Sequence, residues 1–202
     1  MFNQFLQPKN KVSAFWKWFT KYSFEYFHFE NNQNNLFSKL KAELNKIDTN
    51  LVFEFSPIFH DGSREFVISA DGIKSSFPNV VNLVENAPQL SNWKITAFRQ
   101  PRKFINQINC EGLTVNFKDV YFKYSKNSGK INLELNIRGF FESPEWTIAT
   151  FILLDNILGE YDTEMSLDSI TKKELNEDEV SELFPITDLP VIIKNYKMEL
   201  NN

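Results

Sequence analysis

Three charged residues at the ends of predicted strands are the strongest candidates for chemistry in this sequence. Asp71 lies in the motif SADG, and Arg99 and Arg102 lie in the motif AFRQPR. The planar guanidinium of arginine recognises carboxylates and phosphates through paired hydrogen bonds. Ligands of open α/β sheets bind beyond the carboxyl ends of strands, so these motifs predict an anion-binding site. A simpler interpretation is a structural ion pair, in which Arg99 or Arg102 joins Asp71 and holds two loops together.

Glu54 adds a second carboxylate, which we expect on the same strand face as Asp71. Acid–base catalysis needs two such groups in a water-poor cleft that separates their pKa values. A strand face open to water would leave two ordinary carboxylates, and exposed polar faces are common in antiparallel sheets. The four residues Glu54, Asp71, Arg99 and Arg102 are therefore either a ligand-binding site or a solvated, ion-paired surface.

The other reactive side chains do not form a recognisable catalytic or metal-binding set. The chain has two histidines, His28 and His60, and one cysteine, Cys110. Zinc sites take three or four converging ligands, whereas His60 at a predicted hairpin tip would lie about 20 Å from Asp71. Ser69 is outside a G-x-S-x-G elbow and has no nearby histidine to activate it. We therefore expect no metal, no cofactor and no catalytic residue.

The composition is that of an ordinary globular protein, with 42% hydrophobic residues, 21 phenylalanines and a net charge of −4. DNA-binding proteins usually carry a basic field, so we expect no DNA partner. A single cysteine cannot form an internal disulfide, and the first residues lack the apolar run of a signal peptide. We expect a cytoplasmic protein without membrane spans, because the longest apolar run, around 148–154, is too short to cross a bilayer.

Two N-terminal helices are predicted, over 11–30 and 36–47, the second capped by Asn35. An apolar stripe follows the first helix at helical spacing: Phe15, Trp18, Phe19, Tyr22 and Tyr26. Three lysines lie among these residues: Lys11, Lys17 and Lys21. The helix could rest on a membrane or an RNA, or it could face the core while the lysine stems reach water.

A β-hairpin is predicted next, with a two-residue type I′ turn at Asp61-Gly62. That turn pairs Phe55 with Ile68 and Phe53 with Ala70, which places the apolar residues of both strands on one face. A helix capped by Ser76, with Pro78 in its first turn, and a strand over 93–97 follow. These elements form a β-β-α-β unit over 50–98.

The second half predicts the same order of elements over 118–168. Strands alternate over 120–124 and 131–137, and a helix over 144–158 is apolar almost all round, so we expect it to be deeply buried. Gly159 ends that helix, and 160–168 is predicted to be the returning strand.

An acidic, solvated stretch over 172–180 and a terminal helix over 189–200 complete the chain. The whole pattern predicts one compact domain over 1–202 of the α+β class. Its sheet would be mostly antiparallel or mixed, with helices packed on it, and the two β-β-α-β units would follow the N-terminal helices over 11–47.

The run REFVISADG, followed by FPNVVNLVENAPQLSNWKITAFRQPR, and the later run FILLDNILGEYD resemble a family of uncharacterised bacterial proteins. That family is a domain of unknown function with no assigned activity. The resemblance covers 50–102 and 145–162 and implies a shared fold. It supplies no catalytic residue.

Three hypotheses of function follow. The leading one is a cytoplasmic, non-catalytic interaction or regulatory protein that binds an unknown protein partner beside Asp71, Arg99 and Arg102. The second is a hydrolase or transferase in which the two arginines hold an anionic small molecule and Glu54 or Asp71 acts as base. The third is peripheral membrane or RNA contact through the basic, aromatic helix at 11–30, although the acidic composition disfavours nucleic-acid binding and the aromatic stripe is typical of a core-facing helix.

Overall fold

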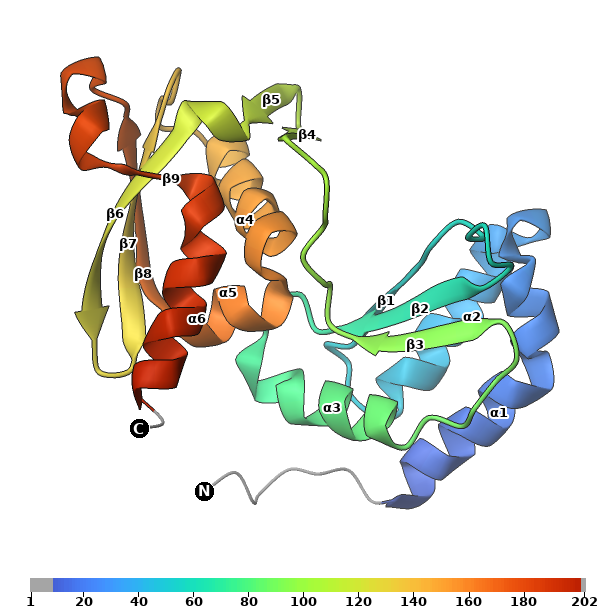
Figure 1. Cartoon of the computed structure of the whole chain (residues 1–202). Coiled ribbons are helices and arrows are strands. Elements are labelled where there is room, and N and C mark those ends of the chain that lie inside the picture. Colours follow the sequence, from blue (N-terminus) through green and yellow to red (C-terminus); the bar gives the residue numbers. More distant parts are fainter. Residues whose placement is uncertain (1–8, 201–202) are drawn as a thin grey trace. The chain divides into compact units, whose positions relative to one another are not determined.

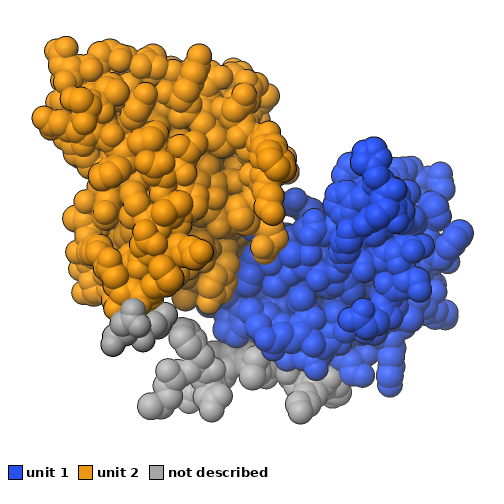
Figure 2. All heavy atoms as spheres, viewed as in Figure 1, with its two compact units in different colours: residues 1–99 blue, residues 100–202 orange. Residues whose placement is uncertain are grey.

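The computed structural model describes residues 9–200, and the chain divides into two compact units, residues 1–99 and 100–202 (Figures 1 and 2). Helices combine with mixed and antiparallel sheets, which confirms the predicted α+β class. The units contain separate sheets, so the two predicted β-β-α-β units do not share one sheet. That the 202 residues fold as one domain stays a prediction.

Unit 1 begins with two helices, α1 (Lys9–Phe27) and α2 (Gln33–Asn45), joined by the 3₁₀ turn η1 (Phe29–Asn31). Both predicted helices are present with shifted ends. The cap predicted at Asn35 is wrong, because α2 begins after Asn32 and Asn35 lies in its first turn. Several asparagines in this stretch can occupy a helix start, and the end of η1 at Asn31 decides which of them does.

The aromatic side of α1 packs into the core of unit 1, which supports the interpretation of a core-facing helix. Phe15 and Phe19 are buried, and the ring of Phe19 stacks on Phe66 with centroids 4.8 Å apart. Trp16, which is not part of the predicted stripe, is also buried, and its indole N–H donates to the carbonyl of Leu83 at 2.8 Å. The three lysines that lie among these aromatic residues in the sequence are all exposed: Lys11, Lys17 and Lys21.

A three-stranded sheet follows, in the order β1 (Val52–Phe55), β2 (Arg64–Ser69) and β3 (Trp93–Ala97). β1 and β2 are antiparallel, and β2 and β3 are parallel. The crossover contains the 3₁₀ turn η2 (Lys74–Ser76) and α3 (Phe77–Glu85). The predicted β-β-α-β order is therefore present.

The side-chain cap predicted for α3 is absent. Ser76 does occupy the N-cap position, but its hydroxyl makes no cap hydrogen bond and instead accepts from the Asn50 side-chain amide at 3.0 Å.

The register of the hairpin differs from the prediction by two residues. Phe55 pairs with Phe66 and Phe53 with Ile68. A slip of two residues preserves the alternation of side chains, so these four residues still share the core face. Phe66 and Ile68 are completely buried, as the predicted face requires.

The type I′ turn predicted at Asp61-Gly62 is also wrong. The N–H of Gly62 donates to Phe59 O at 2.9 Å and the N–H of Phe59 donates to Ser63 O at 2.7 Å, which makes a longer reversal. Gly62 has a φ of +76°, but Asp61 is outside the positive-φ region that a type I′ turn needs at both positions. Pro57 has no N–H for the ladder, which agrees with the end of β1 at Phe55.

The elements of unit 2 are, in chain order, β4 (Gln107–Cys110), β5 (Leu113–Asn116), η3 (Phe117–Asp119), β6 (Val120–Asn127), β7 (Lys130–Ile137), α4 (Pro144–Leu158), α5 (Glu160–Ser166), β8 (Leu167–Glu174), η4 (Glu177–Glu182), β9 (Phe184–Pro185), η5 (Ile186–Asp188) and α6 (Leu189–Leu200). Strands β4 and β5 form a hairpin, and the main sheet has the order β8-β7-β6-β9. Figure 1 shows α4 and α6 over one face of this sheet, where their side chains join the core.

The main sheet repeats the arrangement of unit 1. β6 and β7 form an antiparallel hairpin, and β8 returns parallel to β7 after the helical crossover. The order β-β-α-β is thus confirmed, but the strand predicted over 160–168 is wrong. The returning strand β8 begins at Leu167, and residues 160–166 form α5, whose buried side chains Glu160, Thr163 and Ser166 recur at helical spacing. Because they are polar, a search for apolar periodicity does not detect them.

The acidic stretch over 172–180 is mostly exposed, as predicted, and its first residues belong to strand β8. One further expectation for this unit needs correction. Helix α4 has the predicted bounds but is not buried all round, since Ile148 and Phe151 are each 46% exposed. Its buried side chains lie on one side: Trp146, Ala149, Thr150, Leu153, Leu154 and Leu158.

Candidate functional site

Three of the four predicted site residues meet in unit 1. Glu54 lies in β1, Asp71 follows β2, and Arg99 lies two residues beyond β3. Arg99 Nη2 donates to Asp71 Oδ1 at 2.5 Å, and Arg99 Nε donates to Glu54 Oε1. The predicted ion pair between Asp71 and Arg99 is therefore confirmed, and Glu54 joins it.

The backbone at the ends of β2 and β3 brings these side chains together. Asp71 has a φ of +47°, and its N–H donates to the hydroxyl of buried Ser69 at 3.1 Å, so the chain turns sharply after β2. Phe98 has a φ of +63°, and its N–H donates to Ile68 O at 2.8 Å, one residue beyond the parallel ladder. Arg99 follows that turn and reaches both carboxylates.

Arg99 compensates part of the negative charge of Glu54 and Asp71, and the three side chains sum to −1. Burial disfavours the charge on Arg99, but the hydrogen bonds to Glu54 and Asp71 outweigh burial and raise the pKa of the guanidinium. The two carboxylates are about half exposed, at 46% for Glu54 and 54% for Asp71. An arginine bonded to two carboxylates has little capacity left for a substrate anion, so the geometry favours the structural interpretation.

The fourth predicted residue, Arg102, belongs to unit 2. Its backbone N–H donates to the carbonyl of Asn156 in α4 at 2.8 Å, and the residue is exposed. The structure therefore brings together Glu54, Asp71 and Arg99 and assigns Arg102 to a different unit.

His28 and His60 are exposed, and Cys110 is half-buried in β4, where burial and the neighbouring Glu111 raise the thiol pKa. Within residues 9–200, no group of three or more histidine, cysteine or carboxylate side chains could hold a metal ion. In the same range, every helix is too short or too polar to cross a membrane.

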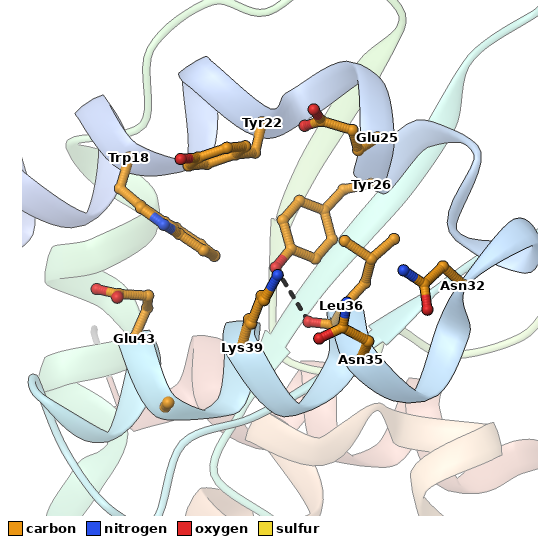
Figure 3. Close-up of a pocket in the computed structure, with 10 residues that line it drawn as sticks. Trp18, Tyr22, Glu25, Tyr26, Asn32, Asn35, Leu36, Lys39 and Glu43 are labelled. Carbon is orange, nitrogen blue, oxygen red and sulfur yellow. Dashed lines mark hydrogen bonds between the residues drawn. The ribbon is translucent and has the colours of Figure 1, made fainter.

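A pocket of about 490 Å³ lies between α1 and α2 in unit 1 (Figure 3). It is lined by Trp18, Tyr22, Glu25, Tyr26, Asn32, Asn35, Leu36, Lys39, Ala42 and Glu43. A second pocket of unit 1, about 590 Å³, is lined by Val12, Ser13, Trp16, Lys17, Thr20, Asn82, Asn86 and Pro88. Neither pocket contains Glu54, Asp71 or Arg99.

Three aromatic rings of α1 form one wall of the pocket between α1 and α2. The Trp18 ring lies 5.7 Å from Tyr22 and 5.6 Å from Tyr26, at interplanar angles of 53° and 59°. Tyr26 is 1% exposed, and its hydroxyl donates to Leu36 O at 3.0 Å, the bond dashed in Figure 3. Burial, with smaller contributions from Glu43 and Glu25, raises the Tyr26 pKa, so this phenol stays neutral at physiological pH.

Charged side chains from both helices complete the lining. Glu25 projects from α1, and Glu43 and Lys39 project from α2 (Figure 3). Glu43 also pairs with Lys46, whose Nζ is 2.6 Å from its Oε1. The apolar spacing of Trp18, Tyr22 and Tyr26 predicts a core stripe and does not predict the pocket that these residues line. Their spacing of four residues predicts a shared face, but a shared face does not distinguish core from pocket.

No protein-family model matches the sequence, and no curated protein or solved structure matches it either. The resemblance to a family of uncharacterised bacterial proteins stays a prediction.

Proposed function

We propose that this protein is a cytoplasmic, non-catalytic interaction protein, and that the pocket between α1 and α2 anchors one side chain of a protein partner. The observation that carries the proposal is the combination of three aromatic rings and two carboxylates around one pocket. Its volume of about 490 Å³ is within the usual range for ligand sites, about 300–1,000 Å³. Tyrosine and tryptophan are also the residues that most often dominate the binding energy of protein interfaces.

The charged cluster of Glu54, Asp71 and Arg99 gives less support to a catalytic function. A general base works best in a water-poor cleft that tunes its pKa, whereas both carboxylates here are about half exposed and bind the same guanidinium. The proposal of a hydrolase or transferase also relies on Arg102, which belongs to unit 2. We therefore assign the cluster a structural role, in which it joins β1 to the turns after β2 and β3.

Contact with a membrane or RNA through α1 is also less favoured. A membrane-bound helix must offer its apolar residues to the lipid, but Phe15, Phe19 and Tyr26 are buried inside unit 1. The exposed lysines alone would give a weak attraction that salt screens.

The proposal is tested by capturing partners from a lysate with the wild-type chain, Tyr22→Ala and Thr20→Ala. Tyr22 lines the pocket between α1 and α2, and Thr20 is an exposed residue of the same helix that lines the second pocket. We expect at least one captured protein whose recovery falls about tenfold with Tyr22→Ala and is unchanged with Thr20→Ala. The tenfold loss is expected because an interface anchor contributes about 1.4 kcal/mol or more to the binding free energy. Equal recovery of every captured protein by both variants would refute the proposal.

A further inference from the structure

We propose that the outer edge of β8 pairs antiparallel with β8 of a second copy of this chain, so that the main sheets of two copies of unit 2 join into one sheet across a two-fold axis. The inference goes beyond the proposed function, because it concerns a different unit and a different partner. It is argued from the open edge of β8, the exposure of its side chains and the order of its charges.

One edge of β8 has no strand paired to it in the described part of the chain. β8 is the first strand in the sheet order β8-β7-β6-β9, and it pairs with β7 alone. No backbone hydrogen bond from residues 9–200 reaches its other edge. A strand that is paired on one side leaves unpaired N–H and C=O groups on the other, and these groups are a template for another strand.

The edge strands β1, β3 and β9 are shorter than β8. β9, at the opposite edge of the same sheet, has two residues, and one of them is Pro185, which lacks an N–H. β1 and β3, the edges of the sheet in unit 1, have four and five residues. β8 has eight residues without proline or glycine, and its bulge lies at its first step, so residues 169–174 offer a regular edge.

Solvent reaches the side chains along this edge. Five of the eight residues are exposed: Asp168, Ser169, Thr171, Lys173 and Glu174. Ile170 is half-buried and packs against the core of unit 2. A second β8 could therefore approach the edge without displacing another described element, and it would cover more of Ile170.

The order of charges in β8 favours an antiparallel second copy. In a parallel pairing in register, Lys172 would lie beside its own equivalent, and like charges on neighbouring strands are destabilising. In an antiparallel pairing centred on Ile170, Ser169 lies opposite Thr171 of the second copy, where two hydroxyls can share a hydrogen bond. Asp168, next to Ser169, then comes near Lys172 of the second copy, and the two-fold axis makes this contact twice.

The charges of Asp168 and Lys172 are not compensated by an ion pair in the described residues. Asp168 accepts from the side-chain amide of Asn127 at 2.7 Å, and Lys172 donates to the hydroxyl of Thr147 at 3.0 Å. Both of these partners are neutral, and neither charged residue forms a salt bridge within 9–200. A second copy would supply each of them with an opposite charge.

The test is sedimentation equilibrium of the full chain from about 10 μM to about 1 mM. One strand pair buries less area than a standard interface of about 1,200–2,000 Å², so we expect a weak dimer with a dissociation constant of about 100 μM. Hydrogen exchange followed by NMR locates the contact. The amides of β8 should exchange more slowly at the higher concentration, whereas those of β3, an edge strand of unit 1, should not change.

Charge reversal tests the pairing. Asp168→Lys and Lys172→Asp should each weaken the dimer about fivefold, because each brings like charges together at two symmetric places. The double variant restores opposite charges and should return the dissociation constant to within about twofold of the wild type. Lys118→Asp, a reversal at an exposed position of η3, is the control and should change nothing. Unchanged amide spectra outside β8 verify that each variant folds.

Three results would overturn the inference. A monomer at every concentration, with unchanged exchange of the β8 amides, would reject the pairing. A dimer that leaves these amides unprotected would place the contact on another surface. A double variant that is weaker than both single variants would exclude the contact between Asp168 and Lys172. None of these results affects the capture of a partner through Tyr22, which decides the proposed function separately.

Discussion

Arg64 donates from Nη2 to Oε1 of Glu30, and the two residues differ sharply in exposure. The side chain of Arg64 is 2% exposed and that of Glu30 is 57% exposed. The guanidinium carbon lies 4.5 Å from the ring centroid of Phe29 and 5.5 Å from that of Phe27. A buried positive charge at the start of β2 is thus stabilised by one carboxylate at the surface and by two aromatic faces.

The Glu30–Arg64 pair predicts a loss of stability in acid. The hydrogen bond from Arg64, opposed by a smaller effect of burial, lowers the pKa of Glu30 below its ordinary value of 4.5. A carboxylate with a lowered folded pKa stabilises the fold above its unfolded pKa, and this stabilisation is lost as the pH falls through the folded value. We expect Glu30→Gln to lower the free energy of unfolding by about 1 kcal/mol at pH 7.

The measurement is urea denaturation of the wild type and Glu30→Gln from pH 7 down to pH 3. The difference between them should begin to shrink below the ordinary pKa of glutamate, where the unfolded chain binds a proton, and should be lost as the pH falls through the lowered pKa of folded Glu30. Glu85→Gln, at an exposed position of α3, is the control and should show no such trend. A difference that stays constant across the range would contradict the assignment.

Arg64 itself predicts a contrast between two substitutions. Its Nε and Nη1 atoms are buried and have no hydrogen-bond partner within the described residues, so part of the charge is desolvated without compensation. Arg64→Met keeps most of the buried volume and removes that cost, so its stability should be within about 1 kcal/mol of the wild type. Arg64→Ala leaves a cavity and should cost about 2–4 kcal/mol. Thermal and urea unfolding distinguish the two outcomes, and equal losses would show that charge, not packing, dominates.

The ion-pair cluster predicts energetic coupling between Asp71 and Arg99. In a double-mutant cycle of Asp71→Asn and Arg99→Gln, the coupling free energy should be about 0.5–1 kcal/mol, since the pair is partly exposed. Raising the salt concentration to 1 M should reduce it. A coupling near zero at low salt would remove the structural role assigned to this cluster.

Phe104 predicts a stabilising substitution. Its side chain is 104% exposed and its φ is +61°, a region that costs a bulky residue about 1–2 kcal/mol. Asparagine tolerates this backbone conformation better, and the aromatic ring is not buried. Phe104→Asn should therefore raise the free energy of unfolding by about 0.5–1 kcal/mol. Phe141→Asn, at another exposed phenylalanine without a positive φ, is the matched control and should not stabilise.

Some of these relationships could be predicted from the sequence because they depend on local spacing. The bounds of α4 follow from Ser143 as cap, Pro144 in the first turn and Gly159, whose φ is +81°. The pairing of Asp71 with Arg99 follows from two motifs that each end a strand. In contrast, Glu30 and Arg64 are 34 residues apart, and no local pattern indicates that a residue of η1 reaches the start of β2.

The alternation of Phe53 and Phe55 with Phe66 and Ile68 determined by itself which side of the hairpin is buried, because a strand repeats every two residues. Only the tertiary structure decided the register, since a slip of two residues keeps the same face and the reversal at 59–63 selects between the alternatives. Likewise, the four-residue spacing of Trp18, Tyr22 and Tyr26 placed three rings on one face of α1. The distance between α1 and α2 decided that this face lines a pocket. That distance depends on the side chains of both helices, so the sequence of α1 alone does not determine it.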